Sequence, residues 1–261
     1  CIAPTDAEIS GLIEDFQIEP DFFRAAMDEE ESSHIDTEDY STLVIIDMPV
    51  AETSGDNVTY STTPLGIIIT EKNVITVCTR GNPVLDEFTD GAVKGVQTNL
   101  KTRFILHLML RIATKYLQYL KQIDKLSSHV ERELRKSMKN SELIQLLDIE
   151  KSLVYFSSSL KGSEITIEKI SRGRVVKLYE EDQDLLEDVL IEVRQAIEMS
   201  SIYLNILSGT MDAFASVISN NLNIVMKVLA SITLIISIPT VISSFYGMNV
   251  EGLPLPFFWF P

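Results

Sequence analysis

The sequence predicts an α+β domain, then a helical hairpin, then one very long helix that continues into a membrane span. Three observations carry this prediction: β-branched runs in the first hundred residues, helical periodicity after them, and a charge-free segment near the C-terminus. The expected parts are residues 1–97, 98–180, 181–224, 225–246 and 247–261.

Short helices and strands fill the first part. Thr5 and Glu8 have the spacing of a capping box, which predicts a helix through Ile13, and Pro20 opens a second short helix. The β-branched runs at 43–46, 65–69 and 74–77 predict strands, with a turn at 71–73. These elements predict a small sheet whose strand order stays open.

Helical periodicity begins at about residue 98. Apolar residues from Phe104 to Leu126 recur at helical spacing, and a second helix is expected over 141–159. Breaks are predicted at 161–163 and 171–174. The pattern predicts two helices that return on each other.

The longest regular pattern follows. Its seam positions, apolar except for one serine, step by fours and threes as in a coiled coil: Leu186, Leu190, Val193, Ile197, Ser200, Leu204, Leu207, Met211, Phe214, Ile218, Leu222 and Val225. A helix from about Leu185 to Phe245 would be roughly 90 Å long, so most of it must be a stalk packed on other helices.

Charge is distributed unevenly along the chain. The formal net charge is −16, and residues 1–60 hold 16 Asp and Glu against one Lys or Arg. Such an acidic region repels the phosphates of nucleic acid, so nucleic acid is excluded as a partner. The charge alone is also explained if these acidic residues simply form a solubilising surface. No phosphate-binding loop, dinucleotide fingerprint or catalytic histidine pair is present, so no enzyme is expected.

The segment from Val228 to Val250 contains no charged residue. As a helix it would reach roughly 35 Å, enough to cross a bilayer core with some tilt, and Pro239 would kink it. Thr233, Ser237, Thr240 and Ser244 are spaced to share one face, which Asn223, Met226 and Ala230 extend. This stripe fits a helix–helix contact face or the wall of a pore.

The span ends in Gly247-Met248-Asn249. A charge-free span that ends in Gly-Met-Asn, after a long helix and an acidic soluble region, resembles the CorA family of divalent-cation channels. In that family the triplet is the selectivity site, which implies a filter at Gly247, Met248 and Asn249. The resemblance also implies a pore lined by Asn223, Met226, Leu229, Thr233, Ser237, Thr240 and Ser244.

Acidic residues in the soluble part acquire an expected role from the same resemblance. It implies that acids near Asp86 and Asp188 face each other across a subunit boundary and bind a regulatory Mg²⁺; Glu87 and Glu192 accompany them. From the residues alone, exposed acids are more often simply solvated. Both interpretations stand at this stage.

Function and placement follow as expectations. The resemblance implies a homopentameric channel for Mg²⁺ uptake, with Co²⁺ or Ni²⁺ as further cargo, gated by cytoplasmic Mg²⁺, and a second span after this segment. Lys227 is the last basic residue, so the positive-inside rule predicts a cytoplasmic N-terminal part at the plasma (inner) membrane. The alternatives are Zn²⁺ efflux by the same family or a pore-less, membrane-anchored coiled-coil scaffold or sensor.

Overall fold

The computed structural model describes residues 1–247, apart from 39, 55–56, 92, 94–95, 138–139, 174–175 and 177. The chain divides into two compact units, Cys1–Ser208 and Gly209–Pro261.

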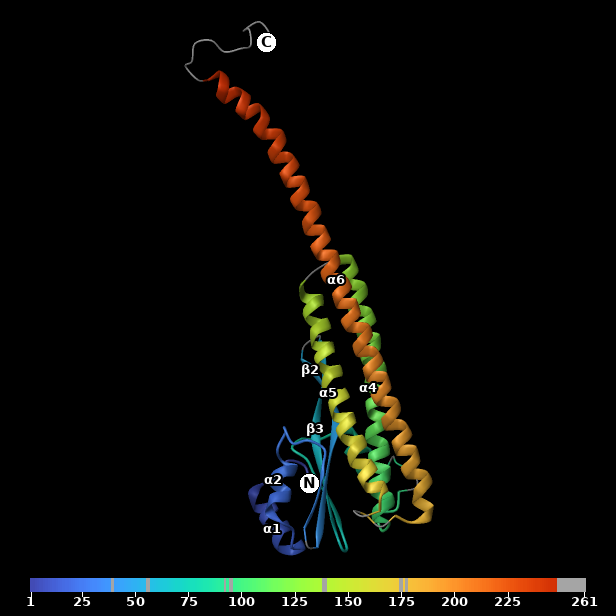
Figure 1. Cartoon of the computed structure of the whole chain (residues 1–261). Helices are drawn as coiled ribbons and strands as arrows, with labels where there is room; N and C mark the ends of the chain where they lie inside the picture. The colour runs from blue at the N-terminus through green and yellow to red at the C-terminus, as the bar shows by residue number, and fades with distance from the viewer. Residues whose placement is uncertain are drawn as a thin grey trace. The chain divides into compact units, whose positions relative to one another are not determined.

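A four-stranded antiparallel sheet organises the first unit (Figure 1). Its strands are β1 (Ile35–Glu38), β2 (Ser41–Ser54), β3 (Asn57–Thr70) and β4 (Val74–Val77), in that spatial order. The β2–β3 register runs from Ser41 opposite Thr70 to Ser54 opposite Asn57. The two central strands are much longer than predicted, because their distal halves are polar and are held by this pairing instead of by an apolar run.

Two short helices cover one face of the sheet. These are α1 (Asp6–Phe16), which has the predicted capping box, and α2 (Pro20–Ala26) (Figure 1). Phe22 and Phe23 are buried with Leu43 and Ile45 in the core of this layer. Gly66 lies under Ala26 so closely that a side chain on Gly66 would overlap that residue. The glycine therefore sets how near α2 can approach the sheet.

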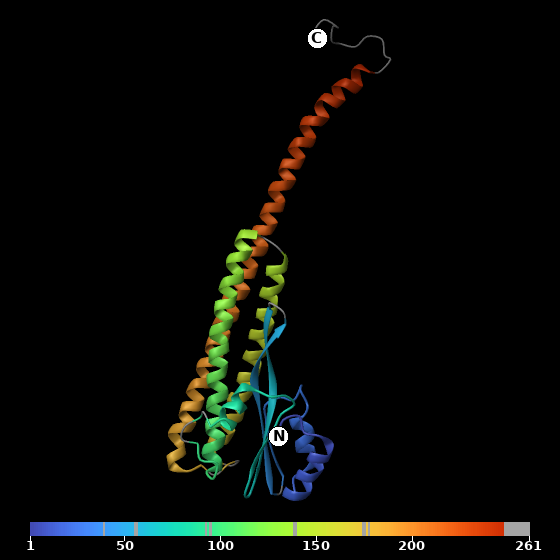
Figure 2. The same ribbon diagram turned by 180° about the vertical axis from the view of Figure 1, so that it is seen from behind.

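Two long antiparallel helices, α4 (Lys101–Ser137) and α5 (Asn140–Ser171), pack on the opposite face (Figure 2). Because helices cover both faces, residues 43–48 of β2 are buried without alternation. Tyr116 and Phe156 meet edge to face at 4.9 Å in the centre of this layer. The α+β class and the helical hairpin are confirmed.

The break predicted at 161–163 was wrong, because α5 continues through it to Ser171. A Cβ on Gly162 would lie 3.4 Å from the Cβ of Ser33, and the hydroxyls of Ser163 and Ser33 are 3.4 Å apart. These small residues therefore allow close contact with the segment that precedes β1. The end predicted at 171–174 is correct, and Gly173 takes a left-handed conformation there.

One short helix was not predicted. Helix α3 (Pro83–Thr89) begins where the side chain of Asn82 accepts a hydrogen bond from Val84 N at 2.9 Å. Phe88 packs against Phe104 of α4 with ring centroids 5.6 Å apart. Tertiary contact therefore supports a helix too short to form by itself.

The helix α6 (Gln183–Tyr246) follows a 3₁₀ turn, η1 (Glu180–Asp182). Within the first unit, Ser200 donates a hydrogen bond to the Leu153 carbonyl at 3.1 Å. Arg194 forms ion pairs with Glu164 and Glu168, each at 2.7 Å. The beginning of α6 is thus joined to α5 by buried and exposed contacts.

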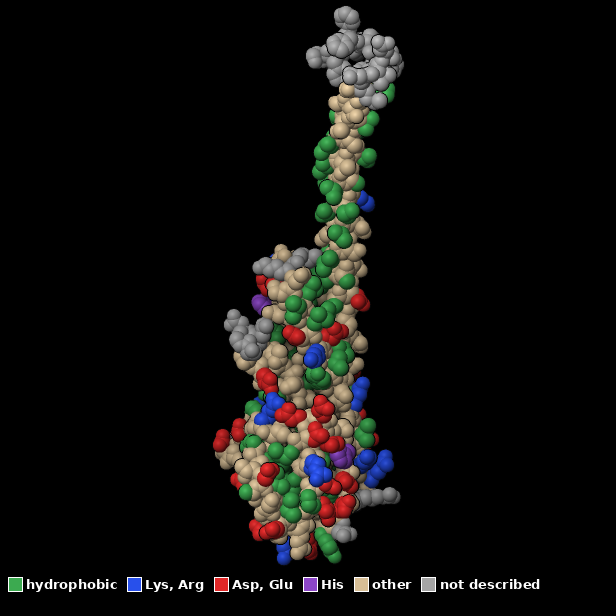
Figure 3. Space-filling model, turned by 90° about the vertical axis from the view of Figure 1, so that its left-hand side faces the viewer, with side chains coloured by type: hydrophobic (Ala, Val, Ile, Leu, Met, Phe, Trp, Pro, Cys, Tyr) green, Lys and Arg blue, Asp and Glu red, His purple; other side chains and the backbone are tan. Residues whose placement is uncertain are grey.

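The second unit contains the remainder of α6 among its described residues. The helix is long and apolar enough to cross a membrane, with a mean hydropathy of 2.1 over its most apolar window. Hydrophobic side chains lie in the open along it (Figure 3). Pro239 is inside this helix, which continues past it to Tyr246.

Candidate ion path and regulatory residues

The hydroxyl groups of the predicted stripe lie on the described part of α6. Thr233 and Thr240 donate to the carbonyls of Leu229 and Ile236, at 2.9 and 2.8 Å. Ser237 donates to Leu234 O at 3.0 Å. Each hydroxyl oxygen keeps lone pairs that can accept a hydrogen bond from water. The helix therefore presents acceptor oxygens along one face without leaving their protons unsatisfied.

The predicted filter begins where α6 ends. Gly247 N donates to Ser243 O at 3.0 Å, and a Cβ at Gly247 would lie 3.3 Å from that same oxygen. A larger residue would therefore crowd the last turn. Met248 and Asn249 lie outside the described residues.

The first acidic set is on α3. Asp86 is exposed, and its main-chain carbonyl accepts a hydrogen bond from the Thr89 hydroxyl at 3.0 Å. Glu87 differs, because its carboxylate faces Arg111 at 3.8 Å and Lys115 at 3.9 Å. A carboxylate whose charge is already shared by two cations is a poorer Mg²⁺ ligand than a free one. Asp86 therefore fits a metal better than Glu87.

The second acidic set is on the beginning of α6. Asp188 is exposed and Glu192 is half-buried, one helical turn apart. Neither forms an ion pair with another described residue. Among the described residues no group of three or more His, Cys, Asp or Glu could hold a metal ion.

A row of basic residues on α4 was missed by the sequence interpretation. Arg103, His107, Arg111 and Lys115 follow each other at intervals of four and are all half-buried. Their spacing was the available signal, since it places them along one side of a helix. Burial, and then the charges of Arg103 and Arg111, lower the pKa of His107. The row therefore carries three lasting positive charges and a neutral imidazole at pH 7.

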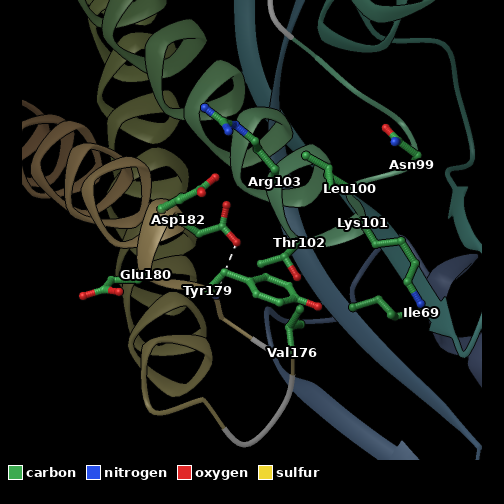
Figure 4. A pocket seen from close by; sticks show the side chains of 11 residues that line it. Ile69, Asn99, Leu100, Lys101, Thr102, Arg103, Val176, Tyr179, Glu180 and Asp182 are labelled. Carbon is green, nitrogen blue, oxygen red and sulfur yellow. Dashed lines mark hydrogen bonds between the residues drawn. The ribbon is translucent and has the colours of Figure 1, made fainter.

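A cavity of about 670 Å³ lies beside the start of α4, between the end of β3 and η1 (Figure 4). Tyr179 projects into it, and Lys101 is engaged with the carbonyls of Thr70 and Glu71 at 3.0 and 2.5 Å. Asp182 accepts a hydrogen bond from Tyr179 N at 3.4 Å. None of the sequence-predicted site residues that the structure describes lines this cavity.

Comparison with known proteins identifies the family. The family model described as "CorA-like Mg2+ transporter protein" matches residues 1–260. The chain belongs to the CorA-like Mg²⁺ transporter family. It is therefore a membrane transporter, and not an enzyme. The expected family resemblance is confirmed over nearly the whole chain.

Individual CorA relatives are distant in sequence. The cobalt/magnesium transport protein CorA of Methanocaldococcus jannaschii is 25% identical over 264 residues, covering 98% of this chain and 80% of the relative. The protein of the same name from Thermotoga maritima is 24% identical over 162 residues, covering 62% and 46%.

Solved structures support the CorA-like fold. The complete structure of the CorA magnesium transporter from M. jannaschii has a TM-score of 0.83 at 24% identity, covering 97% of this chain and 80% of that one. The full-length CmaX protein has a TM-score of 0.76 at 15% identity, covering 99% and 80%. The ZntB cytoplasmic domain from Vibrio parahaemolyticus has a TM-score of 0.61 at 13% identity, covering 82% of each chain. At these identities the structures establish the fold alone.

Proposed function

We propose that this chain forms a homopentameric channel for Mg²⁺ uptake, with Co²⁺ or Ni²⁺ as further cargo, gated by cytoplasmic Mg²⁺. The number five comes from the family resemblance. The single observation that carries the proposal is the hydroxyl stripe of α6, which leads along a charge-free helix to Gly247-Met248-Asn249. A single span cannot enclose a path, so several copies around an axis are required.

The stripe suits an ion that keeps its water. Mg²⁺ binds its six waters tightly and gives them up reluctantly, so its path needs neutral acceptors for the hydrogen atoms of those waters. Thr233, Ser237, Thr240 and Ser244 offer hydroxyl oxygens at successive turns, and Asn223 adds an amide nearer the cytoplasm. Met226 and Leu229 form apolar constrictions between these polar positions.

We assign the selection of the transported ion to the Gly247-Met248-Asn249 triplet. Asn249 presents a neutral side-chain oxygen, and Gly247 and Met248 contribute main-chain carbonyls. Rings of such oxygens hold a hydrated cation without binding it so strongly that it stays. Carboxylates in the same place would slow its release.

Gating is assigned to the acidic residues of the soluble unit. Asp86 and Asp188 fit Mg²⁺ by their oxygen chemistry and exposure, and they would hold the regulatory ion between neighbouring subunits. Glu192 lies one helical turn from Asp188. Glu87 remains paired with Arg111 and Lys115 and is not assigned to the ion. In the absence of the ion the facing carboxylates repel each other and the subunits separate toward a conducting arrangement. The ion shifts this equilibrium only by its greater affinity for the closed state.

Orientation follows from charge. Lys227 is the last basic residue before the apolar segment, and by the positive-inside rule this supports a cytoplasmic soluble unit with Asn249 outside the plasma (inner) membrane. Mg²⁺ therefore enters at the triplet, and the regulatory residues lie in the compartment where its concentration is sensed.

Ion flux into liposomes that contain the full-length protein tests the proposal. We expect Mg²⁺ entry that Asn249→Ala abolishes while the oligomer size on a column is unchanged. The matched control is Asn205→Ala, which removes an exposed amide from the soluble part of α6. Wild-type flux in the Asn249→Ala variant would refute the filter. Zn²⁺ flux without Mg²⁺ flux would indicate a Zn²⁺ transporter, and no flux of either ion would indicate a scaffold or sensor.

A further inference from the structure

Among the described residues, the basic row of α4 has few acidic partners. Glu87 is the one carboxylate that forms ion pairs with it in the described part of the molecule, and both distances are long, 3.8 and 3.9 Å. The side chain of Arg111 remains 38% exposed. The row therefore has positive charge available for another group.

A second row, of opposite charge, lies at the beginning of α6. Asp184, Asp188 and Glu192 also follow each other at intervals of four, and within the described part of the chain none of them forms an ion pair. Four residues advance a helix by about 6 Å, so both rows have the same repeat. Two parallel helices that meet along these rows would bring opposite charges together at successive turns.

Arg111 and Lys115 cannot reach the acidic row of their own chain. Arg103 and Asp182 line one cavity, and the charge of Asp124 adds to burial in raising the pKa of Tyr203. These two pairings show that α4 and α6 run in the same direction, with α6 beside the Asp124 side of α4. Asp124 lies about 140° around α4 from Arg111, at 3.6 residues per turn. Arg111 therefore points away from the α6 of its own chain and cannot pair with it.

We propose that the acidic row of α6 (Asp184, Asp188 and Glu192) in one copy of this chain docks on the two basic residues of α4 that face away from its own α6 (Arg111 and Lys115) in the next. The inference rests on the proposed oligomer, in which an axis along α6 keeps α4 of one copy parallel to α6 of its neighbour. The two surfaces that meet in such an interface are different parts of the chain, as a closed ring of more than two copies requires. Opposite charges that are partly desolvated between subunits also exclude wrong pairings.

This contact adds a regulatory element to the proposed Mg²⁺ site. Arg111 and Lys115 are held near Asp86 by Glu87, so they would compete with the ion for the neighbour's Asp188. The basic row would keep neighbouring subunits attached when the ion leaves. Its charge would also raise the Mg²⁺ concentration needed to occupy the site.

Disulfide trapping between two co-expressed full-length chains tests the contact. One chain carries Arg111→Cys, and the other carries Asp184→Cys, Asp188→Cys or Glu192→Cys, with Cys1 and any further exposed cysteine replaced by Ser. Cys78 is buried and stays. We expect oxidation to give a covalent heterodimer for at least one pair. Ser158→Cys, exposed on α5, replaces Arg111→Cys as the control and should give none.

A charge exchange supplies an independent measurement. Arg111→Asp should lose oligomer on a column at physiological salt, and adding Asp188→Arg in the same chain should restore it. Arg24→Asp, on a residue 80% exposed on α2, should leave the oligomer intact. An intact oligomer that gives no heterodimer for any pair, and that Arg111→Asp does not weaken, would overturn the docking alone. A wild-type protein that is monomeric would overturn the proposed function together with it.

Discussion

The hydroxyl of Tyr116, on α4, donates a hydrogen bond to the main-chain carbonyl of Asp47, on β2, at 3.1 Å. Both residues are buried, and this bond joins the sheet to the helical layer. Burial raises the pKa of the Asp47 carboxyl, and the hydroxyls of Ser159 and Ser33 lower it in part. No Lys or Arg among the described residues pairs with this carboxylate. An acid without a cation in a packed interior makes stability depend on pH.

Asp47→Asn should therefore make the protein more stable at neutral pH. The folded state of the wild type holds the Asp47 proton more tightly than the unfolded state does. The contribution of Asp47 is thus fully present below the ordinary Asp pKa and is lost as pH rises through the raised pKa of the folded protein. The melting temperature of the detergent-solubilised protein, measured across pH 4–8 (roughly the span over which a raised Asp pKa is expressed), checks this.

The comparison with Asp47→Asn is Asp36→Asn, which changes an exposed acid on β1. We expect the Asp47→Asn variant to lose part of the wild-type decline in melting temperature with rising pH, whereas the Asp36→Asn variant keeps it. Parallel pH profiles for the wild type and the Asp47→Asn variant would show that Asp47 titrates normally.

Gly66→Ala should destabilise the soluble unit by about 1–3 kcal/mol, because the added methyl group overlaps Ala26 and must push α2 away from the sheet. Gly11→Ala is the matched control, since no atom lies within 4 Å of the added Cβ. Alanine is the better helix former, so this control should gain roughly 0.5–1 kcal/mol. Chemical denaturation followed by circular dichroism measures both, and equal effects would disprove the packing argument.

Asp188→Ala should weaken inhibition by cytoplasmic Mg²⁺ without changing ion selectivity. The variant loses one proposed ligand of the closed state, so half-inhibition should need a several-fold higher Mg²⁺ concentration. Flux or patch recordings against internal Mg²⁺ provide the measurement. Glu198→Ala, another exposed acid of α6 outside the acidic row, should behave as wild type. Overlaid inhibition curves would remove Asp188 from the regulatory site, whereas lost Mg²⁺ preference would show coupling between stalk and filter.

Mg²⁺ should also protect the assembly against heat and protease. A ligand that binds only the folded assembly stabilises it by about 2.7 kcal/mol at a hundredfold excess over its dissociation constant, a condition that about 20 mM Mg²⁺ is chosen to reach. NaCl of equal ionic strength controls for screening. A double variant, Asp86→Asn with Asp188→Asn, should lose the protection. If chelator and Mg²⁺ give the same melting temperature and trypsin pattern for the wild type, the proposed ligands are wrong.

Local patterns predicted the elements that depend on nearby residues. The capping box at Thr5 and the stop near Gly173 are formed by adjacent groups, and the structure has both. The continuity of α6 was also predictable, because the seam recurs at helical spacing from Leu186 to Val225 and runs without a break into the charge-free segment. Helix α3 and the break expected at 161–163 were mispredicted for the opposite reason. Contacts with Phe104 and with Ser33 decide them, and neither partner is close in sequence.

The amino-acid sequence by itself determined the family, the apolar helix and the Gly247-Met248-Asn249 triplet, since each depends on residue type over a short stretch. Only the tertiary structure decided the strand order, the pairing of Glu87 with Arg111 and Lys115, and the side of α4 on which the basic row lies. Periodicity shows that a helix has faces, but the direction of each face depends on its packing partners. Those contacts join residues far apart in the chain, so no local pattern encodes them.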